Sequence, residues 1–182
     1  MVNNRIASLT LLIILVSAIG WLSGCASPAA TKAMVPGDIP TVQRHPYTVS
    51  VKTQGGSETG AMDSSNISND DFAKAIEESI IKSGLFTQVI HAKGSDYTLS
   101  VTIINMSKPL FGASFTVSME TAWSLVNTVS QDVVMRESIK SSYTATMGES
   151  LVGVTRLRLA VEGAARENIR LGLIAISKLR LE

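Results

Sequence analysis

The chain is predicted to be an α+β protein, with a mostly antiparallel sheet of about four strands and two helices packed on one face of that sheet. Two kinds of pattern lead to this prediction. Apolar and polar residues alternate in four segments, as in half-buried strands, and apolar residues recur at helical spacing in two others. The resulting order of elements is β-α-β-β-β-α, within a single domain at residues 47–182.

The first strand is expected at residues 47–51, where large or branched residues alternate with small polar ones. The helix that follows is expected to begin near Ser68 or Asn69, either of which can cap a helix N-terminus. It should end at Gly84, which can adopt the left-handed conformation, with Leu85 folding back on the last turn. One apolar stripe runs along this helix, at Phe72, Ile76 and Ile80.

Three further strands are expected at residues 97–103, 115–125 and 133–143, with a short polar turn at 127–132. Each of them alternates apolar and polar positions, although Glu137 interrupts the apolar face of the last one. An antiparallel meander of this kind has one apolar face that another element must cover.

The cover is expected from a long helix at residues 154–179. Its charged residues, among them Arg156 and Glu162, fall mostly outside the apolar face, and small residues such as Gly163 would let it approach the sheet closely. A helix lying on a membrane surface is the alternative. Packing on the sheet is favoured because the meander has no other cover. The apolar face consists of Leu157, Val161, Ala165, Ile169, Gly172, Ile176 and Leu179.

The N-terminus has the profile of a signal peptide at residues 1–24. Arg5 provides a positive charge, and residues 6–22 contain no charged side chain. The sequence Leu22-Ser23-Gly24-Cys25 resembles the lipobox of bacterial lipoproteins, which implies cleavage before Cys25 and attachment of a diacylglycerol to its thiol. An uncleaved transmembrane anchor is the alternative, since the apolar run approaches the length of about 20 residues that spans a bilayer.

Cys25 is the single cysteine of the chain, so it has no partner for an intramolecular disulfide. Acylation, for example with palmitate, would explain why the chain has a single cysteine, because it removes a reactive free thiol. By analogy with enteric bacteria, where Asp after the acylated Cys retains a lipoprotein at the inner membrane, Ala26 implies transport to the outer membrane. The expected location is the inner leaflet of the outer membrane, with the domain facing the periplasm.

Residues 25–46 are expected to form the acylated cysteine and a flexible tether. Four of the five prolines of the chain lie here. In an extended conformation the segment would reach about 60 Å. In an alternative interpretation, residues 35–39 pack on the domain instead of belonging to the flexible tether.

The charge of the chain is nearly balanced, with 16 Lys and Arg against 15 Asp and Glu. Removal of Arg5 with the signal peptide makes the two counts equal. Nucleic acid is therefore not an expected partner, since its binding sites are basic. A local basic patch for a polyanion such as lipopolysaccharide remains compatible with this total.

No enzyme is predicted, and no catalytic, metal or cofactor site is assigned. His45 and His91 are expected to be solvated polar residues, and no nucleophile elbow or zinc-binding histidine pair occurs. Glu77 and Glu78 are adjacent in a helix, so they point about 100 degrees apart and cannot act as a close acid-base pair. Acidic and amide side chains between residues 63 and 71 do not follow the EF-hand spacing.

The order of elements, the lipobox and the helix end Ser83-Gly84-Leu85-Phe86 together resemble a group of small lipoproteins that face the periplasm. These are of the TolB N-terminal, LpoB and transport-auxiliary kind. The resemblance covers residues 47–179 and implies a non-catalytic envelope accessory that docks on a synthase, transporter or secretion assembly. It implies no contact residue in this chain.

Two functions follow as hypotheses. The first is an accessory that binds an envelope protein, for which an exposed sheet edge, such as the strand at Tyr47, could accept a partner strand. The second is a carrier of a lipid or other apolar ligand, suggested by methionines whose flexible side chains suit adaptable pockets. An empty apolar cavity would favour the carrier, and a filled core with an open strand edge would favour the accessory. The methionines are Met106, Met119, Met135 and Met147.

Overall fold

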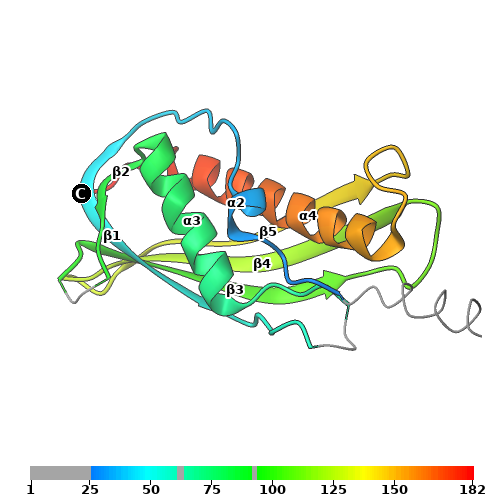
Figure 1. The fold of residues 1–182 in the computed structure, drawn as a ribbon. Helices are drawn as coiled ribbons and strands as arrows, with labels where there is room; N and C mark the ends of the chain where they lie inside the picture. The colour runs from blue at the N-terminus through cyan, green and yellow to red at the C-terminus, as the bar shows by residue number, and fades with distance from the viewer. Residues whose placement is uncertain (1–25, 61–63, 92–93) are drawn as a thin grey trace, which may run out of the picture.

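A computed structural model of the chain describes residues 26–60, 64–91 and 94–182. Its sheet is covered on one face by helices, and short loops join the strands at the two ends (Figure 1). The elements in chain order are α2 (Thr31–Met34), β1 (His45–Gln54), α3 (Asn69–Ser83), β2 (Phe86–Val89), β3 (Tyr97–Ser107), β4 (Phe115–Asn127), β5 (Val133–Ala145) and α4 (Gly153–Ile176). The α+β class is confirmed.

The sheet has five strands in the order β2-β1-β3-β4-β5 and is mixed in direction. The meander β3-β4-β5 is antiparallel, as predicted, whereas β1 runs parallel to both of its neighbours. The expected count of about four strands omitted β2. With only four residues, β2 is too short for its own periodicity to reveal it, and α3 brings it back beside β1 as a parallel neighbour.

Helix α3 forms for the local reasons that its sequence indicates. Ser68 is the N-cap, and its Oγ accepts a hydrogen bond of 3.1 Å from the backbone N–H of Asp71. At the other end Gly84 has φ of 61°, and Leu85 donates its backbone N–H to the carbonyl of Ile80. The expected apolar stripe is fully buried against the sheet.

Helix α4 packs on β5 and β4, so the prediction that it covers the meander is confirmed. Its glycines permit this contact, because a Cβ on Gly163 would lie 2.3 Å from the Tyr143 ring and one on Gly172 would lie 2.5 Å from Trp123. None of the described helices has the length and apolar character needed to cross a membrane.

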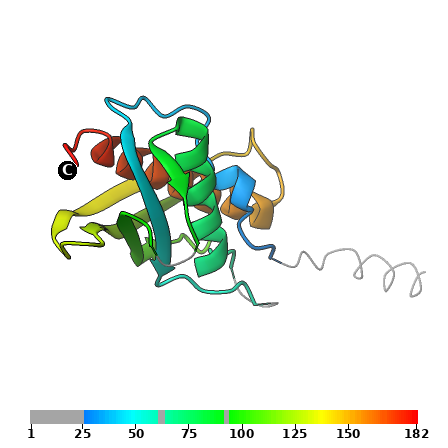
Figure 2. The ribbon, with the colours of Figure 1, turned by 90° about the vertical axis from the view of Figure 1, so that its left-hand side faces the viewer.

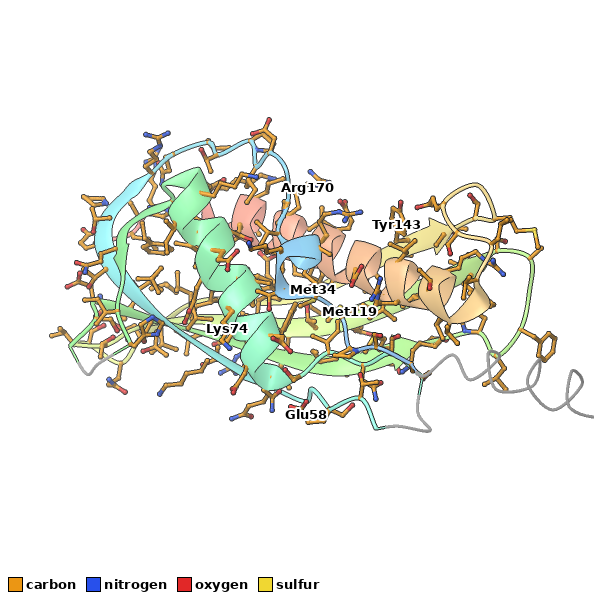
Figure 3. The ribbon with its side chains drawn as sticks, in the orientation of Figure 1. Met34, Glu58, Lys74, Met119, Tyr143 and Arg170 are labelled. Carbon is orange, nitrogen blue, oxygen red and sulfur yellow. The ribbon has the colours of Figure 1, made fainter. Side chains whose placement is uncertain are left out.

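The segment expected to be a tether is packed on the domain from Ala29 onward. Ala29, Met34 and Ile39 are all buried in the core. The short helix α2 contacts both α3 and α4, and it lies beside them in the end-on view (Figure 2). Figure 3 labels Met34 on α2 and Met119 on β4, two of the core methionines. A free linker is therefore not observed at residues 29–44, because apolar side chains along it have a surface to cover.

Candidate functional site

The predicted lipidation site, Cys25, lies outside the described residues. The described chain that follows it is bound to the third and fourth turns of α4. The backbone N–H of Ala30 donates to Glu162 Oε1 at 2.9 Å, and Arg166 donates to the carbonyl of Ala33 at 2.9 Å. Ala29 also donates its N–H to the carbonyl of Asn66. The start of the domain is thus fixed against α4 and not left as a loose arm.

The strand β5 is the candidate partner-binding edge. It is 13 residues long and pairs with β4 on one side, and within the described part of the chain no strand pairs with its other side. Its exposed side chains include Arg136, Glu137 and Lys140. The opposite edge, β2, has only four residues. An unpaired strand of the length of β5 presents backbone N–H and C=O groups that another strand can pair with.

The strand that was expected to provide an open edge does not provide one. That strand, β1 at Tyr47, lies between β2 and β3 and is paired on both sides. Its position depends on β2, which the residue pattern does not reveal. The open edge that is long enough to pair with a partner strand is therefore β5, at the other side of the sheet.

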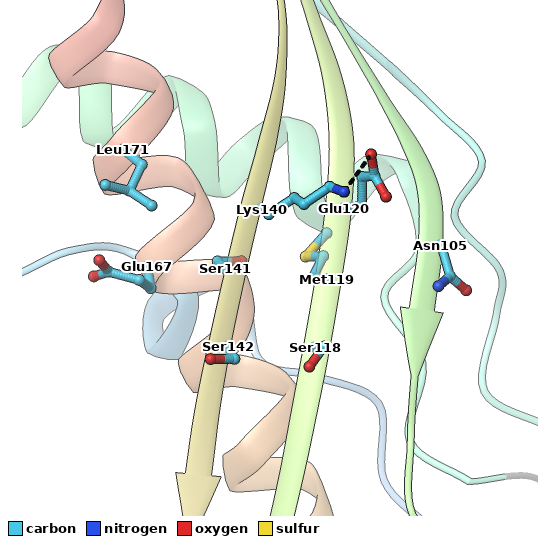
Figure 4. A pocket seen from close by; sticks show the side chains of 9 residues that line it. All are labelled: Asn105, Ser118, Met119, Glu120, Lys140, Ser141, Ser142, Glu167 and Leu171. Carbon is cyan, nitrogen blue, oxygen red and sulfur yellow. Dashed lines mark ion pairs between the residues drawn. The ribbon is translucent and has the colours of Figure 1, made fainter.

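An open groove of about 490 Å³ lies beside this edge (Figure 4). It is lined from three strands and from α4, which supplies Glu167 and Leu171. The strand residues that line it are Asn105, Ser118, Met119, Glu120, Lys140, Ser141 and Ser142. Since most of these side chains are polar or charged, the groove suits a polar chain segment better than an apolar ligand.

The charges in the groove are paired within the protein. Lys140 Nζ lies 3.7 Å from Glu120 Oε1, and Ser138 donates a hydrogen bond of 2.8 Å to the same oxygen. Arg170 donates two hydrogen bonds to Glu167, at 2.6 and 2.8 Å, and they lower the pKa of that carboxyl group. These carboxylates are acceptors held in fixed positions, and the lowered pKa of Glu167 is the opposite of the raised pKa typical of a general acid.

The two histidines occupy different environments. His91 is exposed and lies 3.4 Å from Glu77, whose pKa is raised by burial. His45, expected to be solvated in the tether, is instead buried at the start of β1. Its Nε2 lies 3.0 Å from the carbonyl oxygen of Ile176, and its ring packs on Phe86. His45 thus joins β1 to the end of α4, a structural role that its position among prolines did not indicate.

Of the four methionines, only Met119 lines the groove beside β5. Met119 and Met135 are buried in the core, Met106 packs at its margin, and Met147 is exposed in the loop before α4. Among the described residues no cluster of three His, Cys, Asp or Glu side chains could hold a metal ion.

A buried polar network beneath β5 was missed at the level of sequence. Asn168 Oδ1 accepts hydrogen bonds from Thr121 Oγ1 at 2.6 Å and from Trp123 Nε1 at 3.2 Å, while its Nδ2 donates to the carbonyl of Ile139. Asn168 is fully buried. Ile169 belongs to the predicted apolar face of α4. The position of Asn168 directly before it could have indicated that this side chain is buried.

Two charged residues of α4 that were expected mostly outside its packed face are also buried, Arg156 and Glu162. Arg156 donates to the carbonyls of Ser150 and Gly112 and lies over the ring of Phe115. Glu162 accepts from the backbone of Ala30. Arg156 is buried because it binds two loops, and Glu162 because it binds the N-terminal segment. Helical periodicity does not predict contacts of this kind.

Comparison with known proteins gives no family. No protein-family model matches this chain, and no curated protein sequence matches it. Solved structures do resemble it, at low sequence identity.

The protein XCC0632 from Xanthomonas campestris, of family DUF330, aligns with a TM-score of 0.59 at 13% identity, over 81% of this chain and 90% of its own. The hypothetical protein CT253 from Chlamydia trachomatis aligns with a TM-score of 0.51 at 9% identity, over 72% of this chain and 98% of its own. A minor lipoprotein from Acinetobacter baumannii aligns with a TM-score of 0.41 at 8% identity, over 72% and 94%.

The first two likenesses show a shared fold, and the third is too distant to carry an argument. None of the three bears on the resemblance to the TolB, LpoB and transport-auxiliary lipoproteins, which stays a prediction. The chain thus has the α+β fold of XCC0632 and CT253, and its family is not established.

Proposed function

We propose that the protein is a non-catalytic, lipid-anchored accessory of the bacterial cell envelope. In this proposal Cys25 is acylated, and Ala26 directs the protein to the inner leaflet of the outer membrane. The domain faces the periplasm and binds a partner protein through the edge of β5. The lipobox at Cys25 supports the anchor, and the geometry of β5 supports the binding role.

The observation that carries the binding role is an open 13-residue edge strand on a filled core. Trp123, Leu125 and Met119 fill the space between β4 and the helices and are at most 2% exposed. A peptide strand added to β5 would gain backbone hydrogen bonds from the edge and specificity from the neighbouring groove. The paired charges Glu120 and Lys140 would lie within reach of its side chains.

The alternative, a carrier of an apolar ligand, has less support. The groove beside β5 is open and lined mostly by residues with polar or charged side chains, whereas carrier pockets are enclosed and lined mainly by apolar ones. No observation in the described residues favours the carrier over the accessory.

The binding role can be tested with a photo-crosslinking amino acid placed at Glu137 in the full-length protein in intact cells. We expect one reproducible protein adduct from this exposed position on β5. The matched control is Gln88, an exposed position on the short edge strand β2, from which we expect no such adduct. Equal labelling at both positions, or none at Glu137, would contradict binding at the β5 edge.

The anchor can be tested separately. Cys25→Ser should leave a slower-migrating precursor that no longer incorporates labelled palmitate, whereas continued labelling would overturn the assignment of Cys25. Ala26→Asp should move the protein to the inner membrane fraction, with Ala26→Ser as the control that stays in place. If Ala26→Asp does not change the membrane fraction in which the protein is found, the proposed sorting is wrong. That result would not contradict the lipid anchor at Cys25.

A further inference from the structure

Five of the twelve large apolar side chains that are exposed among the described residues gather at one end of the domain. They lie on two loops, the β3–β4 loop at residues 108–114 and the β5–α4 loop at 146–152, which we call the apolar loops. Leu110 and Phe111 are 94% and 86% exposed, and Leu151 and Val152 are 83% and 57% exposed. Large apolar groups gathered in this way on a surface indicate an interaction site.

The two apolar loops are joined to each other through Arg156. Its guanidinium donates to the carbonyl of Gly112 at 3.2 Å and to that of Ser150 at 2.7 Å, and it is 4% exposed. Both loops extend from the same end of the sheet, next to the first turn of α4 (Figure 1). The exposed tips of the two loops therefore form one surface.

The β5–α4 loop is also ordered by its own hydrogen bonds. Glu149 Oε2 accepts from the backbone N–H of Thr146 at 2.8 Å, and Tyr143 donates its hydroxyl to Glu149 Oε1 at 2.8 Å. The carboxylate is thus held at the base of the loop. The apolar tip is then presented without the entropy cost of ordering a flexible segment.

The chain leaves the domain toward Cys25 at the same end. Ser27 lies beside Val154, Thr155 and Arg158, in the first turn of α4 and just after it. Ala29 is the first buried residue of the part of the chain that the structure describes, and four residues of extended chain span at most about 14 Å. A lipid on Cys25 must therefore enter the bilayer close to the apolar loops.

We propose that the apolar loops dock on the bilayer that holds the lipid of Cys25, with Leu110, Phe111 and Leu151 in the interfacial region. The occupant is a lipid surface because the short connection brings the bilayer to this end of the domain. The inference rests on the proposed acylation of Cys25. The inference also gives the orientation of the domain on the membrane. If the apolar loops face the bilayer, β5 runs from the membrane surface outward.

The test is a tryptophan reporter in the full-length, lipidated protein. Phe111→Trp is reconstituted in vesicles of phosphatidylethanolamine and phosphatidylglycerol whose acyl chains carry bromine. Docking should shift its emission to the blue and quench about half of it or more, as expected for a side chain at the boundary of headgroups and acyl chains. Fluorescence of the unmodified protein, which includes the buried Trp123, is subtracted.

The matched control is Val129→Trp. Val129 is 89% exposed, like Phe111, but lies in the β4–β5 turn at the other end of the domain. Its emission should stay that of a solvated indole. Equal responses of the two reporters, or no response of Phe111→Trp, would overturn the docking proposal. The same blue shift of Phe111→Trp in non-acylated protein without lipid or detergent would also overturn it, in favour of a second copy of the chain.

A second reporter tests whether the two loops act together. Leu151→Trp should be quenched in the same vesicles, and adding Phe111→Asp should reverse at least about half of that quenching. Both positions are exposed loop residues, so folding is not at stake. The mass of the acylated N-terminus, measured on the same sample, separates the two proposals. Acylated, vesicle-bound protein without quenching contradicts docking only, and protein without acyl groups contradicts the anchor.

Discussion

Helix α3 is defined at both ends by its own residues, whereas helix α4 is held by what it meets in the rest of the fold. The Ser68 cap and the left-handed Gly84 bound α3. Helix α4 begins after Val152 without a side-chain cap. Its position depends instead on two glycines against aromatic rings and on Asn168 within a buried network.

This difference shows that two helices with similar apolar stripes can be specified by different means. The determinants of α3 lie within a short stretch of sequence, where capping and periodicity are readable. Those of α4 are pairs of residues that lie far apart in the chain. Substitutions in α4 should therefore have larger effects than substitutions at the ends of α3.

The largest effect is expected at the contact of α4 with Trp123. Gly172→Ala places a Cβ 2.5 Å from the ring of Trp123, which is fully buried and cannot move aside. We expect a loss of about 2 kcal/mol in the free energy of unfolding, although alanine favours a helix by up to about 1 kcal/mol. Urea denaturation measures this. Gly153→Ala is the control, because nothing lies within 4 Å of its added Cβ, and it should change stability by less than about 0.5 kcal/mol.

The buried network gives the next largest effect. Asn168→Ala removes the nearest acceptor of the Thr121 hydroxyl and the nearer side-chain donor to the carbonyl of Ile139 from a buried network. We expect a loss of about 2 kcal/mol in the same measurement. Glu167→Ala, at the adjacent position and partly exposed, should cost less than about 0.5 kcal/mol. Similar losses for the two variants would show that α4 is not held by the network.

The cap of α3 should contribute less. Ser68→Ala removes the acceptor for the backbone N–H of Asp71 and should cost about 1 kcal/mol. The control is Ser57→Ala, an exposed serine in the preceding loop, for which no change is expected. A loss at Ser68 that exceeds the loss at Gly172 would reverse the comparison between the two helices.

The smallest effects concern pH, and they have opposite signs on the two helices. Burial raises the pKa of Glu77 on α3, so its charged form is disfavoured by folding at neutral pH. The hydrogen bonds from Arg170 lower the pKa of Glu167 on α4, so its charged form is favoured. Glu77→Gln should therefore increase stability at pH 7, and Glu167→Gln should decrease it.

Both differences should diminish on acidification, which urea denaturation at a series of pH values can follow. The stability contributed by Glu167 is present above the ordinary Glu pKa of about 4.3 and is lost as the pH falls through its lowered value. The destabilisation by Glu77 disappears as the pH falls through its raised value. Shifts of the same sign in both variants would contradict these assignments.

Most of the fold could be predicted because most of its elements are long and periodic. The α+β class, both long helices and the antiparallel meander follow from residue patterns. The sheet order does not, because it depends on β2, four residues whose pairing with β1 is a tertiary contact. The candidate binding edge could not be predicted for the same reason. Which strand lies at an edge is a property of the whole sheet.

The N-terminal segment shows the same limit in another way. Prolines and small residues between residues 25 and 46 are typical of a linker, and nothing local indicates that Met34 is buried. The acceptor for Ala30, the carboxylate of Glu162, lies 132 residues further along the chain. A contact over that separation leaves no periodic signal.

The sequence by itself determined where α3 begins and ends, which faces of β3 and β4 are apolar, and that Cys25 has the context of a lipidation site. These depend on capping, alternation and a short motif, all of which act over a few residues. Only the tertiary structure decided that β1 is internal, that β5 is open, and that the chain after Cys25 lies beside the apolar loops. Each of these depends on which distant segments meet, and packing and buried hydrogen bonds decide that when the whole domain has formed.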